Sequence, residues 1–367
     1  MINVAFVFED SRFGGPHAQA VATIKKIKGI NFKVLISNKS SHIFRRKLRH
    51  KKIIYEEKDM HSISLNFNSL LKYIFFFIRD FFTIFFFLRK NDIDIVHIPG
   101  GLYFFKTVLA AKLARKKIIW HIHDEQSNPI LKYIFYFIRN NINYFLFASY
   151  SSLKYYKKYL PLKAKKSVIQ STIDDKFFRL KRKISNKILI LTVANISPVK
   201  DIETIILAAK QLEKYKNDIS FIIIGQVWDS QKKYFHKILK MIYENKISNI
   251  KIIDKFTDPV KFYSNSSIYI CSSLNESSPM AVWEAMSSGL PIITTPCGDI
   301  KYLLKNNFNT LIFNKKNYNS LAKKIIYLIN NKKVRNKISK NAKITAYNEF
   351  LAQKNIPKIK NIYNEIY

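Results

Sequence analysis

The chain has 367 residues, and its 63 Lys and Arg against 25 Asp and Glu give a formal net charge of +38 at neutral pH. A length of about twice a typical domain predicts two domains, each large enough for its own core. The two cysteines exclude a disulfide framework, and neither has metal-ligand spacing to a histidine, so a reducing, cytoplasmic compartment is expected. The positive charge favours anionic partners, which include nucleotide phosphates, anionic lipid head groups and nucleic acid.

The amino-terminal half alternates strand and helix patterns from its first residues onward. Strands are predicted at 2–8, 32–37, 94–98 and 117–123, and helices at 17–28, 70–88, 105–116 and beyond the last of these strands. The first ten residues lack the basic leader, apolar stretch and cleavage site of a secretory signal. This order of elements is typical of a doubly wound parallel sheet with right-handed crossovers.

A second domain of the same kind begins after the charged segment 181–187. Strands are predicted at 187–195, 220–225, 249–254, 266–273 and 290–295, and helices at 201–215, around 232–245 and at 281–289. The predicted fold class is therefore α/β, with two Rossmann-like, doubly wound domains facing a cleft. We expect the domains at 1–178 and 188–345, a linker at 179–187, and a C-terminal helix at 346–367 that returns to the first domain.

The segment Leu70–Leu88, with the sequence LLKYIFFFIRDFFTIFFFL, approaches the length of a membrane span. Arg79 and Asp80 lie at its middle and each costs roughly 2.5–3.5 kcal/mol on insertion, which disfavours a spanning helix. We expect an unusually aromatic helix, with one face on its domain and another in the head-group region of an anionic membrane surface. A basic cluster at 44–52 and a second aromatic run at 131–147 favour this interpretation. A buried core helix beside a solvated charge run is the alternative.

Two carboxylates, Glu276 and Glu284, have seven residues between them inside the apolar stretch 271–298. The pattern before them predicts a short buried strand, and residues 277–279 form a helix start. The N–H groups of such a start would point beyond the carboxyl end of the strand, where open α/β sheets bind anionic ligands. One carboxylate could then accept hydroxyls from one part of a ligand, and the other from a second part. A surface helix that happens to carry two glutamates is the alternative.

Glu276, Glu284 and the following AMSSGLPIITTPCG resemble the signature of retaining, nucleotide-sugar-dependent glycosyltransferases of the GT-B fold, in particular glycosyltransferase family 4. The resemblance implies that Glu276 contacts the donor sugar and that Glu284 contacts the ribose of the nucleotide. The donor-binding residues expected at the helix start are Ser278, Pro279, Met280 and Ala281.

Lys200, in VANISPVKDIETI, follows a predicted strand and opens a helix, from where it could reach a diphosphate. This segment resembles the family's glycine-arginine-leucine segment followed by a lysine, in which both cations bind the donor phosphates. Asn195 stands in place of the arginine and Ala194 in place of the glycine, which leaves Lys200 as the main cation. An ordinary exposed lysine in a lysine-rich protein is the alternative. Gly225, which ends the predicted strand 220–225, is also assigned to donor binding.

The first half contributes two glycines and a histidine to the expected site. Gly14 and Gly15 permit close approach of the backbone to phosphate or sugar, and they resemble the family's glycine-rich first loop. A tight turn is the alternative. His123, followed by Asp124 at a strand end, resembles the family's histidine beside the donor sugar. His97 matches another family position, where a structural, hydrogen-bonded histidine is equally expected.

The resemblance, together with these features, implies a retaining glycosyltransferase that moves a hexosyl or N-acetylhexosaminyl group from a nucleotide-diphosphate sugar to a hydroxyl of a glycan or lipid-linked acceptor, in bacterial cell-surface polysaccharide or lipopolysaccharide synthesis. Its catalytic candidates are Glu276, His123 and Lys200. No Asp-x-Asp motif stands at a strand end, and the family generally works without a divalent ion, so neither metal nor cofactor is expected.

The expected partners are the nucleotide sugar, the acceptor and an anionic membrane surface, at the inner face of the cell membrane. Nucleic acid is not expected as a partner. Two alternatives stay open: another GT-B sugar-nucleotide enzyme, epimerase or phosphorylase-like, and a non-enzymatic, basic nucleic-acid-binding protein, for which no recognisable module is present.

Overall fold

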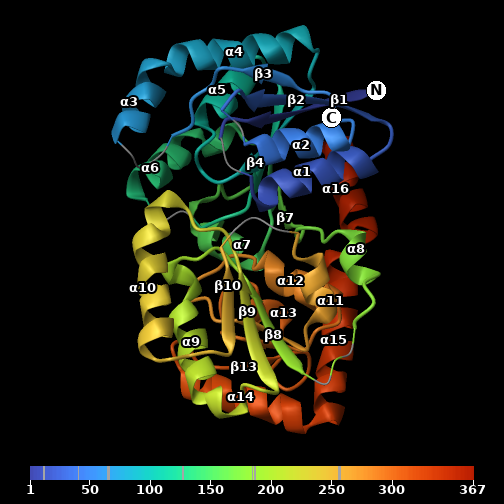
Figure 1. Ribbon diagram of the computed structural model, residues 1–367. Coiled ribbons are helices and arrows are strands. Elements are labelled where there is room, and N and C mark those ends of the chain that lie inside the picture. The colour runs from blue at the N-terminus through green and yellow to red at the C-terminus, as the bar shows by residue number, and fades with distance from the viewer. Residues whose placement is uncertain are drawn as a thin grey trace. The chain divides into compact units, whose positions relative to one another are not determined.

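The structure, a computed structural model, describes residues 1–10, 13–39, 41–63, 67–125, 128–183, 185, 187–254 and 258–367 (Figure 1). It divides into two compact units: Met1–Thr172 together with Ala352–Tyr367, and Ile173–Leu351. Each unit is built on one parallel sheet with helices around it, which confirms the predicted fold class. The sequence predicts the first domain to end at 178 and the returning helix to begin at 346, whereas the contacts put these limits at 172 and 352.

Seven strands form the first sheet in the order β3-β2-β1-β4-β5-β6-β7, and every described pairing is parallel. Their bounds are β1 Ile2–Phe8, β2 Ile30–Ser37, β3 Glu56–Lys58, β4 Ile95–Gly100, β5 Lys117–Ile122, β6 Tyr144–Phe147 and β7 Lys166–Val168. The sequence predicts β1, β2, β4 and β5 from buried apolar runs. It misses β3 and β7, which have three residues each, and β6, which lies within the aromatic run at 131–147.

Helices cover both faces of the first sheet (Figure 1). Their bounds are α1 Gly15–Lys26, α2 His42–His50, α3 Phe67–Phe75, α4 Phe77–Lys90, α5 Phe105–Leu113, α6 Pro129–Ile138, α7 Tyr150–Tyr156 and α16 Ala352–Ile366, with 3-10 turns η1 Arg139–Asn141 and η2 Lys157–Tyr159. Successive side chains of β1 point to opposite faces, so Phe6 packs with α1, α2 and α16, whereas Val7 packs with α4, α5 and α6. The basic cluster at 44–52 therefore lies over the face opposite to the aromatic α4.

The aromatic segment Leu70–Leu88 is not one helix, because a turn at Phe76 separates α3 from α4. The Phe76 ring stacks on His61 at 4.5 Å, and the Arg79 guanidinium lies 4.4 Å from its centre. These contacts hold the turn against the loop that follows β3. The prediction of a single helix is therefore wrong. The hydrophobic pattern of the segment carries no sign of the break, because the break is stabilised by contacts with His61, which lies outside the segment. Among the described residues, no helix is long and apolar enough to cross a membrane.

The last helix, α16, completes the core of the first unit although its residues follow the whole second unit in the sequence. Ile356, Ile359 and Tyr363 pack in the same cluster as Phe6, and α16 contacts α1. The Tyr363 hydroxyl lies 2.6 Å from Nδ1 of His97 on β4. The first sheet thus depends for one of its covering layers on residues 352–366.

Six strands form the second sheet in the order β10-β9-β8-β11-β12-β13, again with every described pairing parallel. Their bounds are β8 Ile188–Val193, β9 Ile219–Ile224, β10 Ile250–Ile253, β11 Ile268–Cys271, β12 Ile292–Thr294 and β13 Leu311–Ile312. The helices are α8 Asp175–Phe178, α9 Ile202–Gln211, α10 Lys232–Glu244, α11 Val260–Asn265, α12 Met280–Ser287, α13 Ile300–Leu303, α14 Tyr318–Asn330 and α15 Lys332–Phe350, with 3-10 turns η3 Pro198–Lys200, η4 Glu213–Tyr215 and η5 Asp229–Gln231. The order of strands reverses between β8 and β11, as it does between β1 and β4.

The described part of the predicted linker 179–187 is fastened to the second unit. Arg182 is largely screened from solvent and donates from Nη1 to the carbonyl of Gly289 and from Nη2 to the carbonyl of Ser266, both at 3.0 Å. These carbonyls stand just before β12 and β11, at the amino edge of the sheet. The segment is therefore bound to the second unit and does not act as a free linker. The chain passes from the first unit to the second earlier, after Thr172.

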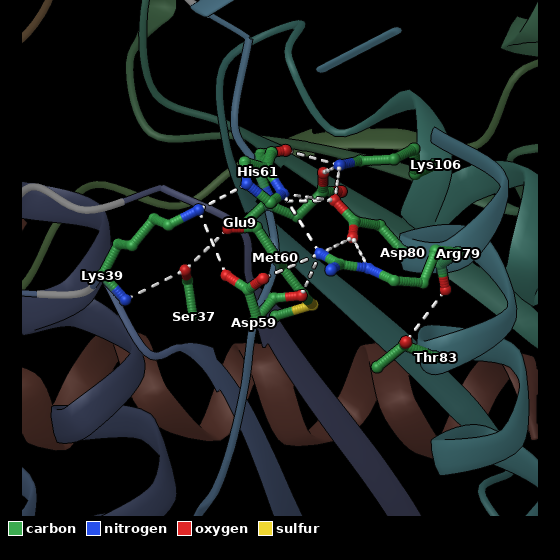
Figure 2. A network of polar contacts seen from close by, with 10 residues as sticks. All are labelled: Glu9, Ser37, Lys39, Asp59, Met60, His61, Arg79, Asp80, Thr83 and Lys106. Carbon is green, nitrogen blue, oxygen red and sulfur yellow. Dashed lines mark hydrogen bonds and ion pairs between the residues drawn. The ribbon is translucent and has the colours of Figure 1, made fainter. Parts of the chain in front are cut away.

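A buried ion network lies at the carboxyl edge of the first sheet (Figure 2). At its centre, Lys106 at the start of α5 places Nζ 3.0 Å from Oδ2 of Asp80 and 3.3 Å from Oε2 of Glu9. All three side chains are at least 98% buried, and Lys106 also donates to the carbonyl of His61. Thr107 donates from Oγ1 to Glu9 at 2.7 Å. One ammonium group thus forms ion pairs with a carboxylate that follows β1 and with another from α4.

The network reaches solvent through Asp59, whose carboxylate lies 3.1 Å from Nζ of Lys39 and 3.0 Å from Nη2 of Arg79. Arg79 continues inward to Oδ1 of the buried Asp80 at 2.9 Å. Figure 2 shows Arg79 pointing back across the loop after β3 toward Asp59 and His61. The start of α4 is therefore joined to the ends of β1, β2 and β3 by charge as well as by packing.

Burial raises the pKa of Glu9, and the charge of Lys106 opposes that rise. Burial acts upward on the pKa of Asp80 as well, but the Lys106 charge and the hydrogen bonds from Lys106, His61 and Arg79 together hold it below its ordinary value. Asp80 therefore stabilises the folded chain above its unfolded pKa, and this contribution is lost as the pH falls through the folded pKa. The raised pKa of Glu9 has the opposite effect. Protonated Glu9 stabilises the folded chain at low pH, and this contribution is lost as the pH rises through its folded pKa.

Lys106→Met should lower the free energy of unfolding at pH 7 by about 3 kcal/mol, because it removes the cation paired with the buried Glu9 and one of the cations paired with the buried Asp80. Without Lys106 the folded-state pKa values of both carboxyls rise above the unfolded values, so the deficit should shrink as the pH falls toward about 4. Urea unfolding at several pH values measures both effects. Lys112→Met, at an exposed position of the same helix, should change stability by less than about 0.5 kcal/mol. A deficit that grows as the pH falls would contradict the assignment.

Candidate functional site

The strongest candidate site lies at the carboxyl edge of the second sheet, where the strand order reverses between β8 and β11. Lys200 ends the turn η3 in the loop after β8, and Glu276 lies in the loop after β11. The two loops touch: Ser272 donates from Oγ to the carbonyl of Lys200 at 2.7 Å, and the N–H of Leu274 donates to Val199 at 2.8 Å. Such reversal points are where open α/β sheets bind their ligands.

Lys200 and Glu276 meet at this point as an ion pair, Nζ to Oε1. Their side chains are 21% and 17% exposed, so the pair is accessible but partly shielded. Ser273 donates from Oγ to the same carboxylate oxygen at 3.0 Å. The two residues that the sequence singles out independently are therefore neighbours, and a serine that it does not single out also binds the carboxylate.

The helix start expected after Glu276 is present, because α12 begins at Met280 with Pro279 as its N-cap residue. The first N–H groups of a helix, here those of Met280 and Ala281, have no partner within the helix and carry partial positive charge. The Ser278 hydroxyl oxygen accepts the indole N–H of Trp283 at 2.9 Å, which ties the loop to the buried face of α12. Ser278 thus has a structural contact in addition to its predicted role.

Glu284 lies in the second turn of α12, and its Oε2 accepts the hydroxyl of Tyr263 from α11 at 2.9 Å. Tyr263 is fully buried. Burial raises the pKa of Tyr263 well above its usual value, and the negative charge of Glu284 raises it further, so the phenol remains protonated and able to donate. No short-range pattern in the sequence marks Tyr263, because it lies 21 positions from the residue that it contacts.

Two glycines let backbone segments approach closely around the site. A Cβ at Gly298 would lie 2.3 Å from the carbonyl oxygen of Glu276 and 2.4 Å from that of Ser277, and its φ of +49° disfavours any side chain. A Cβ at Gly225 would lie 1.7 Å from the carbonyl oxygen of Ala194. Gly225, predicted to bind donor, therefore has a packing requirement of its own. Gly298 was not predicted, although it stands in the motif.

The two cysteines lie beneath the same loop, both buried and free of disulfides. Cys271 ends β11, and its thiol lies 3.5 Å from Oγ of Ser273. A hydrogen bond from the Cys297 thiol lowers the pKa of Cys271 to about 7, while burial and the charge of Glu276 oppose this. Among the described residues, no group of three His, Cys, Asp or Glu is placed to hold a metal ion.

Asn195, which stands in place of the family's arginine, lies in the second unit two positions after the end of β8. The other predicted residues, Gly14, Gly15 and His123, belong to the first unit. Gly14 precedes α1 in an extended conformation, and a Cβ there would meet only Cδ of Pro16 at 3.8 Å, so packing does not require this glycine. Gly15 is the first residue of α1. His123 follows β5, and its Nε2 is buried without a hydrogen-bond partner in the described parts of the chain. Burial lowers the pKa of His123 to about 3, aided by the charge of His17, so its ring is neutral near pH 7.

Both ring nitrogens of His97 already have partners, which favours a structural role for this residue. It is buried, and its two ring nitrogens lie 2.6 Å from the Tyr363 hydroxyl and 3.2 Å from Nδ1 of His121. Burial lowers the pKa of His97 to about 3. The His121 ring lies 4.1 Å from that of His123, as the alternation of a strand predicts. The structural interpretation of His97 therefore fits its contacts.

Solved structures and family profiles show which proteins this chain is similar to. The Anabaena protein Alr3699/HepE, crystallised with UDP, matches with a TM-score of 0.84 and 16% identity over 99% of this chain and 100% of that chain. Sequence profiles of two families match consecutive parts of the chain: Glycosyltransferase Family 4 over residues 28–177 and Glycosyl transferases group 1 over residues 174–345. The chain belongs to the GT-B glycosyltransferases.

Two relatives illustrate the range of this glycosyltransferase's family. An uncharacterized glycosyltransferase of Methanocaldococcus jannaschii is 24% identical over 289 residues, which is 76% of this chain and 77% of the relative. An Escherichia coli enzyme, UDP-Gal:alpha-D-GlcNAc-diphosphoundecaprenol alpha-1,3-galactosyltransferase, is 25% identical over 187 residues, 43% of this chain. The glycosyltransferase spans 48% of that enzyme's length.

Gly298→Ala should destabilise the glycosyltransferase by about 2–4 kcal/mol, since the methyl group must displace the backbone that carries Glu276 and also adopt a positive φ. Thermal unfolding measures the loss. Gly14→Ala is the matched control, because its Cβ would make only an ordinary van der Waals contact with Cδ of Pro16, and it should change stability by less than about 0.5 kcal/mol. Equal melting temperatures of the two variants would show that the close approach at Gly298 is not as tight as described.

Proposed function

We propose that the glycosyltransferase transfers a hexosyl or N-acetylhexosaminyl group from a nucleotide-diphosphate sugar to an acceptor hydroxyl, with retention of anomeric configuration. The observation that carries the proposal is the Lys200–Glu276 pair at the reversal point of the second sheet, beside the start of α12. The crystallised complex of the similar Anabaena protein with UDP supports a uridine nucleotide as the first donor to test.

The reaction breaks the bond between the anomeric carbon and the diphosphate oxygen, so positive charge develops on the sugar and negative charge on the leaving group. In the proposal, Lys200 and the first N–H groups of α12 stabilise the diphosphate. Lys200 then leaves its ion pair, which frees the Glu276 carboxylate to accept hydroxyls of the sugar. Glu284 accepts the ribose hydroxyls. Without donor, Lys200 and Glu276 neutralise each other, and in the proposal the bound donor separates them.

Retention is proposed to follow from attack on the same face that the diphosphate leaves. The acceptor oxygen forms the new bond to the anomeric carbon, and its proton passes to the leaving phosphate oxygen. This scheme needs no divalent ion, because Lys200 and the helix start supply the positive charge. His123 remains a predicted contact of the donor sugar, and its neutral ring suits hydrogen bonding to a hydroxyl better than charge stabilisation.

We propose a glycan or lipid-linked acceptor of bacterial cell-surface polysaccharide or lipopolysaccharide synthesis. The name of the E. coli relative, whose acceptor is linked to diphosphoundecaprenol, supports this class. A lipid-linked acceptor would bring the enzyme to a membrane, at its cytoplasmic side where nucleotide sugars are made available.

An exposed apolar surface on α3 and α4 supports the membrane part of the proposal. We call it the aromatic surface, and its residues are Leu71, Ile74, Phe75, Ile78, Phe82 and Phe86. Each of them is between 42% and 81% exposed. On α3, Ile74 and Phe75 lie three and four positions after Leu71, and on α4, Phe82 and Phe86 follow Ile78 at intervals of four, so each set lies along one side of its own helix. Ile84, Phe87 and Leu88 of α4 are buried in the core instead. The helix pair thus presents one apolar side to its own unit and another to solvent.

Basic residues accompany this surface on the same side of the first sheet, where α4 and α6 both pack on α5. Residues 126–173 contain eight Lys or Arg and no Asp or Glu. Lys132 on α6 lies 5.2 Å from the centre of the Tyr155 ring on α7, which joins the two helices. A hollow of about 650 Å³ beside them is lined by Lys154, Tyr155, Lys157 and Lys158. Each basic group near an anionic membrane contributes about 1 kcal/mol.

Donor binding and turnover test the first part of the proposal. One of a panel of UDP-, GDP- and ADP-sugars should raise the melting temperature and release nucleotide, with or without EDTA. Glu276→Gln and Lys200→Met should each reduce turnover about 100-fold, because each removes charge stabilisation at the reacting centre. Lys323→Met, at an exposed position of α14, is the control. If no sugar nucleotide binds, or if both site variants turn over like the wild type, the proposal is wrong.

Vesicle flotation tests the membrane part. The wild type should bind phosphatidylglycerol vesicles at low salt and lose binding at high salt. Replacing Ile74, Phe75 and Phe82 together by Ser should weaken binding at least tenfold, since each apolar side chain contributes about 1 kcal/mol or more when buried in lipid. Tyr243→Ser on α10, which removes an equally exposed ring from the second unit, should not. Unchanged binding of the triple variant would refute the role of the aromatic surface.

A further inference from the structure

The buried tyrosine beneath α12 has a role that the mechanism above does not assign. We propose that Tyr263 is a positioning residue, which orients the Glu284 carboxylate toward the ribose of the donor nucleotide. The inference rests on the proposed donor role of Glu284, and it names a residue on a different helix, α11, as a determinant of nucleotide affinity.

Tyr263 is held rigidly. Its side chain is fully buried, its ring stacks on that of Tyr269 at 6.0 Å and 27°, and Phe177 meets it edge-on at 5.5 Å. A buried ring with aromatic neighbours on more than one side has little rotational freedom. Its hydroxyl therefore occupies a fixed point under α12.

That hydroxyl is aimed at the second turn of α12. It lies 2.9 Å from Oε2 of Glu284 and 3.2 Å from the carbonyl oxygen of Ala281. A phenol has one proton to donate, and the shorter, charge-assisted contact to the carboxylate is the stronger of the two. Because burial and the Glu284 charge both raise the pKa of Tyr263, the donor persists throughout the pH range in which the enzyme can be assayed.

The bond restricts the rotation of the Glu284 side chain. Glutamate has three side-chain torsions, and ordering them on ligand binding costs free energy at that moment. Anchoring one oxygen in advance fixes the direction of the carboxylate before the nucleotide arrives. Tyr263 thus acts through Glu284 and does not itself have to touch the donor.

Tyr269 provides a matched control within the same stack. It is equally buried, and its hydroxyl donates to the carbonyl of Val193 at 3.2 Å. Tyr263→Phe and Tyr269→Phe each remove one buried hydroxyl and keep the ring, so both should lower the melting temperature by similar amounts. Only the first removes a hydrogen bond to a predicted ligand-binding carboxylate.

The experiment compares the Kd of UDP with that of 2′,3′-dideoxy-UDP, which lacks the hydroxyls that Glu284 would bind, by calorimetry on the full chain. Tyr263→Phe should weaken UDP binding by about five- to tenfold, in line with the loss of one well-placed hydrogen bond, and should leave the Kd of the dideoxy nucleotide unchanged. Tyr269→Phe should leave both unchanged. In turnover assays the Tyr263→Phe effect should appear in the KM of the donor and not in kcat.

Three results would overturn the inference: equal weakening of both nucleotides by Tyr263→Phe, an equal effect of Tyr269→Phe, or no effect of either. The wild type separates this outcome from a failure of the proposed function. If it binds neither UDP, GDP nor ADP, the donor role of the site is wrong. If it prefers GDP or ADP, the same comparison is made with the dideoxy form of that nucleotide.

Discussion

Both units depend on one constraint, which is that parallel strands of a sheet all end at the same edge. In the second unit this constraint, together with the reversal of strand order between β8 and β11, brings loops from different parts of the sequence into contact. Lys200 and Glu276 meet there because each follows one of these two strands. In the first unit the same geometry gathers Glu9 and Lys106 beside β1 and β4. The proposed donor-binding pair and a structural network thus share one origin.

The two charge clusters differ in exposure, and this difference separates their roles. Lys106 and its carboxylates are sealed from water, so their interaction is strong and their separation is costly. Lys200 and Glu276 remain partly exposed, so a charged ligand can compete for each of them. Lysine and carboxylate side chains therefore stabilise the fold in the first sheet, whereas in the second sheet they remain open to a competing ligand. The number of ion pairs alone would not distinguish the two cases.

Much of the fold was predictable because continuous apolar runs identify the buried strands of a parallel sheet, as in β1, β2, β8 and β9. Glu276 and Lys200 were recognisable from local motifs. Ser273 and Tyr263 were not, because their importance arises from contacts: one with a carboxylate in the same loop, the other with a helix 21 positions away. The break at Phe76 depends in the same way on His61, a residue outside the segment whose pattern predicts a helix.

The return of α16 to the first unit has a consequence for how the chain folds as it is synthesised. The second unit is a continuous segment, Ile173–Leu351, and all its strands leave the ribosome before α16 does. The first unit has its seven strands early but lacks part of one covering layer until residues 352–366 have been made. Until then the cluster that contains Phe6 and Ile30 lacks the side chains of that helix. The unit that is translated first is therefore the one that finishes folding last.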